Sequence, residues 1–169
     1  LRLAIACVLV VVGWGSSAGA WDTTAGNDTN YGSITFGNGH DKGYGVAVDS
    51  SGNVYTTGVY DGASESGNFP ASNGERDVFV TKLNAAGAHQ WTTTFGGTDQ
   101  DYGYGVAVDG SGNVYVTGSF TGTVDFGAGN VTSAGGSDVF VTKLNAAGAH
   151  QWTTTFGGTG TDTGRGLAV

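Results

Sequence analysis

The chain has 169 residues, which usually make one domain, and contains 33 glycines but a single proline. Its 4 Trp, 7 Tyr and 8 Phe are too many apolar rings for a disordered, solvated chain. The net charge of −8, from 14 acidic and 6 basic residues, argues against nucleic acid and anionic membrane surfaces as partners, because phosphate binding needs clustered cations. Glycine mixed with Val, Thr, Tyr and Phe is typical of short β-strands joined by tight turns.

The first 20 residues have the pattern of a secretory signal peptide. Arg2 gives a positive start, residues 3–12 form an apolar run, and small residues precede the expected cleavage site after Ala20. A membrane anchor is the alternative, but a spanning helix needs about 20 apolar residues and this run is about half as long. Cys7, the single cysteine, lies inside this segment. We therefore expect a secreted or cell-surface chain with no disulfide and no membrane span after cleavage.

Beyond the leader, the chain reads as short strands and turns. Residues 46–48 and 54–57 are predicted strands, joined by a Ser-Ser-Gly-Asn turn. Residues 78–83 and 90–95 are the next two, joined by a turn with a central glycine. The segment between the two pairs, residues 59–76, is predicted to be a long loop. This is a unit of four antiparallel strands.

The same unit then occurs again. Residues 77–98 are repeated without a change at residues 138–159, and residues 43–58 recur at residues 103–118 with two substitutions, Ser50/Gly110 and Thr56/Val116. A further copy begins at Gly164. The predicted organisation is a signal peptide at 1–20, an N-terminal segment at 21–42, repeats at 43–102 and 103–163, and the start of a third at 164–169.

Tandem units of four strands are typical of a β-propeller. The pattern G-x-A-V-D-x-x-G-N-V-Y-x-T-G, followed by D-V-F-V-T-K-L-N-x-x-G-x-x-x-W-x-x-x-F-G-G, resembles the SBBP repeat of bacterial secreted proteins over residues 31–169. That resemblance implies an all-β fold, a seven-bladed β-propeller of four-stranded antiparallel blades, of which this chain holds about two full blades plus partial ones. We expect a fragment of a larger ring; assembly of several copies into a ring is the alternative.

Residues 32–37 resemble the fourth strand of the unit but come before any first strand. In a closed propeller, a leading strand of this kind completes the last blade and hides two sheet edges. A decayed repeat is the other interpretation, and both stay open.

Acidic residues recur before the first strand of each unit, where Asp41, Asp101 and Asp162 each stand one residue ahead of a G-x-G. Because strand direction alternates, these loops should share one end of the sheets with the predicted long loops at residues 59–76 and 119–137, where the units differ. Variable loops on a rigid scaffold commonly form binding surfaces. Capping of turns by the aspartates is the alternative, and the pattern favours it. The binding-face candidates are Asp41, Asp101, Asp162, Glu65, Glu75, Arg76, Phe120 and Phe126.

Other patterns carry no predicted chemistry. His89 and His150 are one turn position in two units and do not supply the convergent ligands of a zinc site. The G-S-S-A-G stretch at residues 15–19 matches a nucleophile elbow but lies in the leader. Residues 157–162 match the start of a calcium-binding nonapeptide, yet such sites need copies every nine residues. No catalytic residue, metal or cofactor is predicted.

Two functions fit these observations. The first is a non-catalytic, exported scaffold that binds an unknown protein or glycan. The alternative is a propeller enzyme, lyase- or hydrolase-like, whose active-site blades are missing from this chain. A catalytic site needs distinct groups at distinct places, and the near identity of the two units favours the scaffold.

Overall fold

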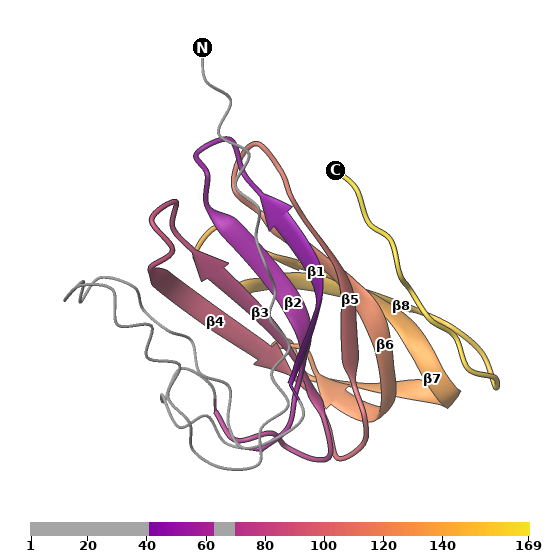
Figure 1. The fold of residues 1–169 in the computed structure, drawn as a ribbon. Helices are drawn as coiled ribbons and strands as arrows, with labels where there is room; N and C mark the ends of the chain where they lie inside the picture. The colour runs from indigo at the N-terminus through magenta and orange to yellow at the C-terminus, as the bar shows by residue number, and fades with distance from the viewer. Residues whose placement is uncertain (1–40, 63–69) are drawn as a thin grey trace.

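The computed structural model describes residues 41–62 and 70–169; the predicted leader, the segment at residues 32–37, His40 and Glu65 lie outside them. The described chain is all β and forms two four-stranded antiparallel sheets, each with its strands in chain order (Figure 1). In those ranges the structure contains no helix with the length and hydrophobicity needed to cross a bilayer.

The first sheet contains β1 (Lys42–Val48), β2 (Val54–Tyr60), β3 (Asp77–Leu83) and β4 (His89–Phe95), and the second contains β5 (Tyr102–Val108), β6 (Val114–Asp125), β7 (Asn130–Leu144) and β8 (His150–Phe156). The predicted strands of each unit are thus confirmed, and each unit forms one sheet. The first strand is longer than predicted, because the glycine-rich residues before 46 also belong to it.

The β1–β2 turn shows why the repeated sequence folds as it does. Asp49 Oδ1 accepts hydrogen bonds from the backbone amides of Ser51 and Asn53, both at 2.9 Å. This aspartate satisfies the turn amides in place of strand pairing. Asp109 makes the same two contacts, at the same lengths, in the β5–β6 turn.

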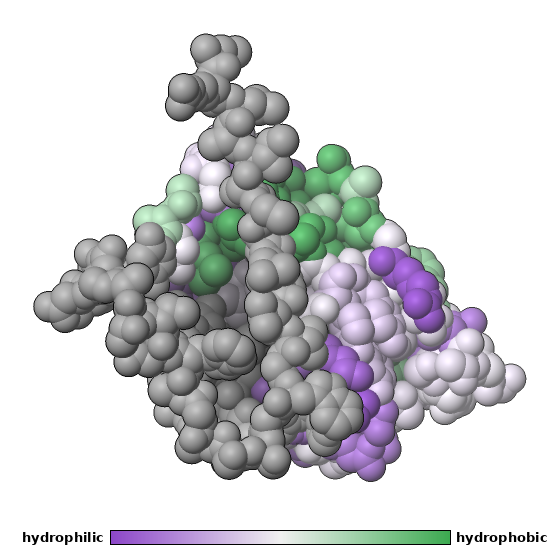
Figure 2. Space-filling model, viewed as in Figure 1, coloured by the Kyte–Doolittle hydropathy of each residue, from purple (hydrophilic) through white to green (hydrophobic). Residues whose placement is uncertain are grey.

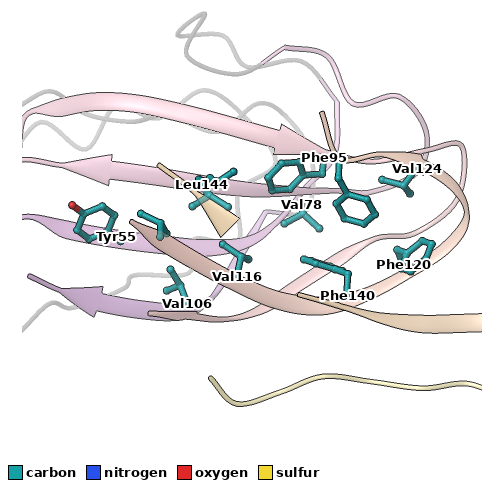
Figure 3. Packing of buried hydrophobic residues seen from close by; sticks show 12 residues of the cluster. Tyr55, Val78, Phe95, Val106, Val116, Phe120, Val124, Phe140 and Leu144 are labelled. Atoms are coloured by element: carbon teal, nitrogen blue, oxygen red, sulfur yellow. The ribbon is translucent and has the colours of Figure 1, made fainter. Parts of the chain in front are cut away.

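One face of the first sheet packs on the second sheet. Strand β5 lies against β1, β2 and β3. Val78, Val80 and Phe95 from the first sheet are buried in one cluster with side chains of the second, among them Phe140 and Leu144 (Figure 3). The sequence run Val78-Phe79-Val80, apolar on both sides of its strand, is fully buried. The hydrophobic core therefore lies between the two blades.

The second unit departs from the prediction of a long loop at residues 119–137, which is wrong. Strand β6 continues to Asp125 and β7 begins at Asn130, so that only residues 126–129 form a turn. Thr123 pairs with Thr132 and Val124 with Val131. The alternating Thr and Val residues favour strands, and Asp125 Oδ1 accepts hydrogen bonds from the turn amides of Gly127 and Gly129 at 2.7 and 3.0 Å.

This hairpin folds back between the sheets. The strand register shifts at Gly122, whose φ is +69°, and Asp125 then forms a bridge with Gly96 beyond β4. The Phe126 ring lies 5.0 to 5.7 Å from the rings of Phe140, Phe120 and Phe95. Phe120 and Phe126 are 0% and 2% exposed. Their expected place on a binding face is therefore corrected: they are core residues, because the gap between the sheets beside β4 needs apolar filling.

Truncation of Phe126 tests this assignment. Phe126→Ala should lower the free energy of unfolding by about 3–5 kcal/mol, because it empties a packed site between the sheets. Phe156→Ala is the matched control, since that ring is 55% exposed, and it should change stability far less. Urea unfolding followed by tryptophan fluorescence measures both. Equal effects of the two substitutions would contradict the folded-back hairpin.

Candidate functional site

Antiparallel chain order places the strand connections at two ends of the sheets. The short turns within β1–β2, β3–β4, β5–β6 and β7–β8 lie at one end. The connections β2–β3 and β4–β5, and the segment after β8, lie at the other. We call residues 61–62, 70–76, 96–101 and 157–163 the long-loop end. It corresponds to the predicted binding face, without the β6–β7 hairpin.

The aspartates before each first strand hold loops in place. Asp101 Oδ2 accepts a hydrogen bond from the Gly97 amide at 2.8 Å, and its Oδ1 accepts one from the Thr121 amide at 3.0 Å. Asp41 accepts from the Asp61 amide at 3.3 Å, and Asp162 from the Gly158 amide at 3.1 Å. The contacts of Asp101 with Gly97 and of Asp162 with Gly158, four residues apart, are turn caps, the alternative that the sequence pattern favoured. The contacts of Asp41 and Asp101 with amides 20 residues away instead join separate segments. Nor does the described part of the chain contain a group of three or more acidic, His or Cys side chains that could hold a metal ion.

Burial gives Asp101 unusual electrostatics. The residue is 1% exposed. Loss of hydration raises the pKa of Asp101 to about 7; the two amide hydrogen bonds act in the opposite direction, and the charges of Asp77 and Asp99 reinforce the rise. Asp77 is buried as well, which raises its pKa, and its Oδ2 accepts from the Asn73 amide at 2.8 Å. The Asp101 carboxyl thus holds the connection between the two sheets, and the Asp77 carboxyl holds the connection between β2 and β3.

Glu75 and Arg76 belong to a polar network that closes this joint. Arg76 Nη1 donates to the Tyr102 hydroxyl at 3.1 Å. That hydroxyl donates to Gln100 Oε1, and Gln100 Nε2 donates to Glu75 Oε2 at 2.5 Å. Two binding-face candidates that are neighbours in the sequence thus share one network, which also contains Gln100 and Tyr102, neither of which the sequence analysis singled out.

The G-Y-G motif of β1 and β5 forms a β-bulge. In β5 the pairing passes from Gly103↔Gly118 to Gly105↔Thr117, so Tyr104 is an extra residue without a cross-strand partner. A Cβ on Gly118 would lie 1.8 Å from the Tyr102 carbonyl oxygen, so only glycine fits opposite the bulge. The same shift in β1 makes Tyr44 the extra residue. Bulges re-aim side chains, and here both re-aimed side chains are tyrosines.

These rings form a cluster on the first strands. The Tyr44 and Tyr104 ring centroids lie 5.2 Å apart, and the parallel rings of Tyr102 and Tyr104 lie 5.7 Å apart. The Arg165 guanidinium lies 5.5 Å from the Tyr104 ring centroid. Tyr44 is 44% exposed. We call Tyr44, Tyr102, Tyr104, Arg76 and Arg165 the tyrosine patch.

The surrounding surface separates into two regions. Figure 2 shows a hydrophobic area around the upper part of β1 and β5, and a pale to hydrophilic area toward the lower, long-loop end. Partial burial and then the neighbouring hydroxyls of Tyr104 and Tyr102 raise the pKa of Tyr44. The tyrosine patch thus combines aromatic surface with hydrogen-bonding groups, the composition that protein binding sites favour.

Two stretches of the chain match a known repeat family. The SBBP family, described as a beta-propeller repeat, matches residues 23–59 and 90–123. The chain carries SBBP β-propeller repeats. The second match runs from β4 through β5 into β6, so the family unit includes the joint between two blades and the bulge.

Part of the chain is also similar to a curated protein. The Regulatory protein FlaEY of Caulobacter vibrioides is 34% identical to this chain over 99 residues, which are 56% of the chain. They are only 10% of that protein, so the chain spans about a tenth of its length.

The SBBP repeats of this chain differ from one another at the tyrosine patch. Core positions are nearly identical between the units, whereas the bulge position changes from tyrosine to arginine at the third copy. The equivalent positions are Tyr44/Tyr104/Arg165, Lys42/Tyr102/Thr163, Arg76/Ser137 and Gln100/Thr161. Sequence reasoning missed these tyrosines. The sequence did contain a signal for them. A residue between two glycines, followed by a Thr-Gly pair in the next strand, is a pattern typical of a β-bulge.

The repeated histidines lie at the other end. His89 Nε2 and the Thr92 hydroxyl are 2.9 Å apart, and His150 and Thr153 make the same contact at the same distance. Both histidines are half-buried and engaged locally. They are separate from the tyrosine patch and provide control positions for it.

Gly118→Ala tests the bulge. The new methyl group would meet the Tyr102 carbonyl, so the variant should lose about 3 kcal/mol of stability or fail to fold. Gly110→Ala is the control, because a Cβ there meets nothing within 4 Å, and it should change stability by less than about 0.5 kcal/mol. Urea midpoints measure both. A Gly118→Ala chain as stable as the Gly110→Ala chain would show that the bulge does not need glycine.

Asp101 predicts a pH dependence of stability. Its folded pKa is raised, so the folded state binds a proton more tightly than the unfolded state, and stability is lost as pH rises through about 7. Between pH 5 and 8 this contribution should fall by an amount on the order of 2 kcal/mol. Asp101→Asn should remove this dependence of stability on pH. It should also lower stability by a constant amount, because one hydrogen bond from a backbone amide is lost. Unfolding of both chains across this range checks it; parallel curves would mean that Asp101 is ionised throughout.

Proposed function

We propose that this chain is part of a non-catalytic β-propeller scaffold, exported by a bacterium, that binds a protein or a glycan through the tyrosine patch, beside its long-loop end. The observation that carries the proposal is the tyrosine patch, where three rings on β1 and β5 meet the guanidinium groups of Arg76 and Arg165. Rigid support lowers the entropy lost on binding. The leader-like residues 1–20 support export.

The distribution of sequence differences supports binding over catalysis. The units share their core and their short turns, and they differ at the tyrosine patch and in the β2–β3 and β6–β7 connections. The described aspartates at the long-loop end bind backbone amides, which fits a structural rather than a proton-transferring role.

We also propose that further blades flank the two sheets. Val46 is 52% exposed, whereas its equivalent in the second sheet, Val106, is 8% exposed against the first sheet. Phe156 is exposed, whereas its equivalent Phe95 is buried. The two uncovered faces thus match the two halves of the existing contact, as expected of stacked repeats. A chain that sediments as a monomer with a sharp melting transition would count against further blades.

A binding assay with fractionated material tests the proposed function. The labelled chain is incubated with a bacterial cell-surface extract separated into a protein fraction and a polysaccharide fraction. Arg76→Gln and Tyr104→Ala should weaken binding to one fraction at least tenfold, because both remove parts of the tyrosine patch. His89→Ala, at the opposite end, should leave binding unchanged. Binding lost through His89→Ala with the patch intact, or hydrolysis of either fraction, would refute the scaffold.

A further inference from the structure

We propose that the tyrosine patch binds an acidic oligosaccharide, with sugar rings on the tyrosines and carboxylates on the arginines. This inference rests on the proposed function and names the ligand of the same site. It follows from the charge, the shape and the size of the patch.

Charge is the first argument. The chain carries −8, yet Arg76 and Arg165 meet at one cluster of rings, and Lys42 stands in β1 at the position that Tyr102 has in β5. Two carboxylates lie near Arg76. Glu75 accepts a hydrogen bond from the neutral Gln100 amide and so keeps its charge, and Asp61 adds to the raised pKa of Arg76, which comes first from the hydrogen bond with Tyr102. The cation that the patch offers to a ligand is therefore Arg165 above all, which lies over the Tyr104 ring.

The other described cations are placed differently. Lys82 and Lys143 lie 5.2 and 5.0 Å from the ring centroids of Tyr55 and Tyr115, beside the short turns. There Asp49 and Asp109 accept hydrogen bonds from those same two tyrosines, so each lysine has a carboxylate near it. Arg165, over the Tyr104 ring, is therefore the cation of the described chain that is best placed to meet an anionic group.

Ring geometry is the second argument. A pyranose has an apolar face of C–H groups and a rim of hydroxyls, and tyrosine offers an apolar ring with a polar tip. Tyr44 comes from one blade and Tyr104 from the next, 5.2 Å apart. Arg165 continues the series from the third copy, over Tyr104. A chain of sugars that crosses the blades would meet Tyr44, then Tyr104 and then Arg165.

Size is the third argument. A stable protein–protein interface uses roughly 20–30 residues on each side, whereas the tyrosine patch is a short series on adjoining first strands. A narrow ligand suits it better than a broad one. Guanidinium groups bind carboxylates in a bidentate, geometrically specific way, so uronate units fit better than neutral sugars.

Binding measurements on the full chain test the proposal. The probes are oligogalacturonide, which is acidic, and maltooligosaccharide, which is neutral, each measured by calorimetry. We expect binding of the first at least tenfold tighter than of the second. Tyr104→Ala and Arg165→Gln should each weaken oligogalacturonide binding tenfold or more. Lys143→Gln is the matched control, because it removes the same kind of cation–ring pair at the other end, and it should change nothing.

Each contrary outcome has a definite meaning. Equal binding of maltooligosaccharide overturns the acidic class, and oligogalacturonide binding that survives both Tyr104→Ala and Arg165→Gln overturns the site. Absence of sugar binding, with patch-dependent binding to the protein fraction of the cell-surface extract, overturns this inference but leaves the proposed function standing. Binding to both fractions that is unchanged by the substitutions in the tyrosine patch overturns the proposed function as well. Circular dichroism of each variant shows whether the β fold is kept.

Discussion

The close backbone approach of successive first strands is the constraint on which the rest of the structure depends. A Cβ on Gly45 would lie 3.0 Å from the Tyr104 carbonyl oxygen and 3.2 Å from the Val106 amide. A Cβ on Gly105 would lie 3.2 Å from the Arg165 carbonyl oxygen. Because glycine has no Cβ, each first strand can lie against the next. Apolar side chains, and finally the β6–β7 hairpin, then fill the remaining space between the blades.

The bulge separates the variable surface from the constant core. Residues within the strand pairing alternate between the two faces of the sheet. Those on a packed face form the contact between blades, so a change there disturbs that contact. Tyr44 and Tyr104 stand outside that pairing. In the sequence, the equivalent position carries tyrosine in two copies and arginine in the third. Near-identical repeats can in this way present a distinctive surface.

Buried polar contacts hold that surface in place. The Asp101 amide donates to the Arg76 carbonyl at 2.8 Å, and the Asp101 carboxylate binds the Thr121 amide. One residue thereby connects Arg76, directly before β3, with the joint between the sheets and with Thr121 inside β6. Gln100 and Tyr102, on either side of it, are held where they bond to each other and to Arg76. A ligand that met the tyrosine patch would find it already ordered.

The sequence by itself determined the strands that both units share, their order and the repeat, because these depend on local alternation, on turn residues and on a pattern that occurs twice. It also indicated that Asp101 caps a loop. It did not show that β6 and β7 extend through most of residues 119–137, where a loop was predicted. Only the tertiary structure decided where Phe120 and Phe126 lie, since a hairpin that folds back between sheets is set by the space beside β4. The grouping of Tyr44, Tyr104 and Arg165 was also beyond the sequence: they are far apart along the chain, and packing of successive blades is what brings their side chains together.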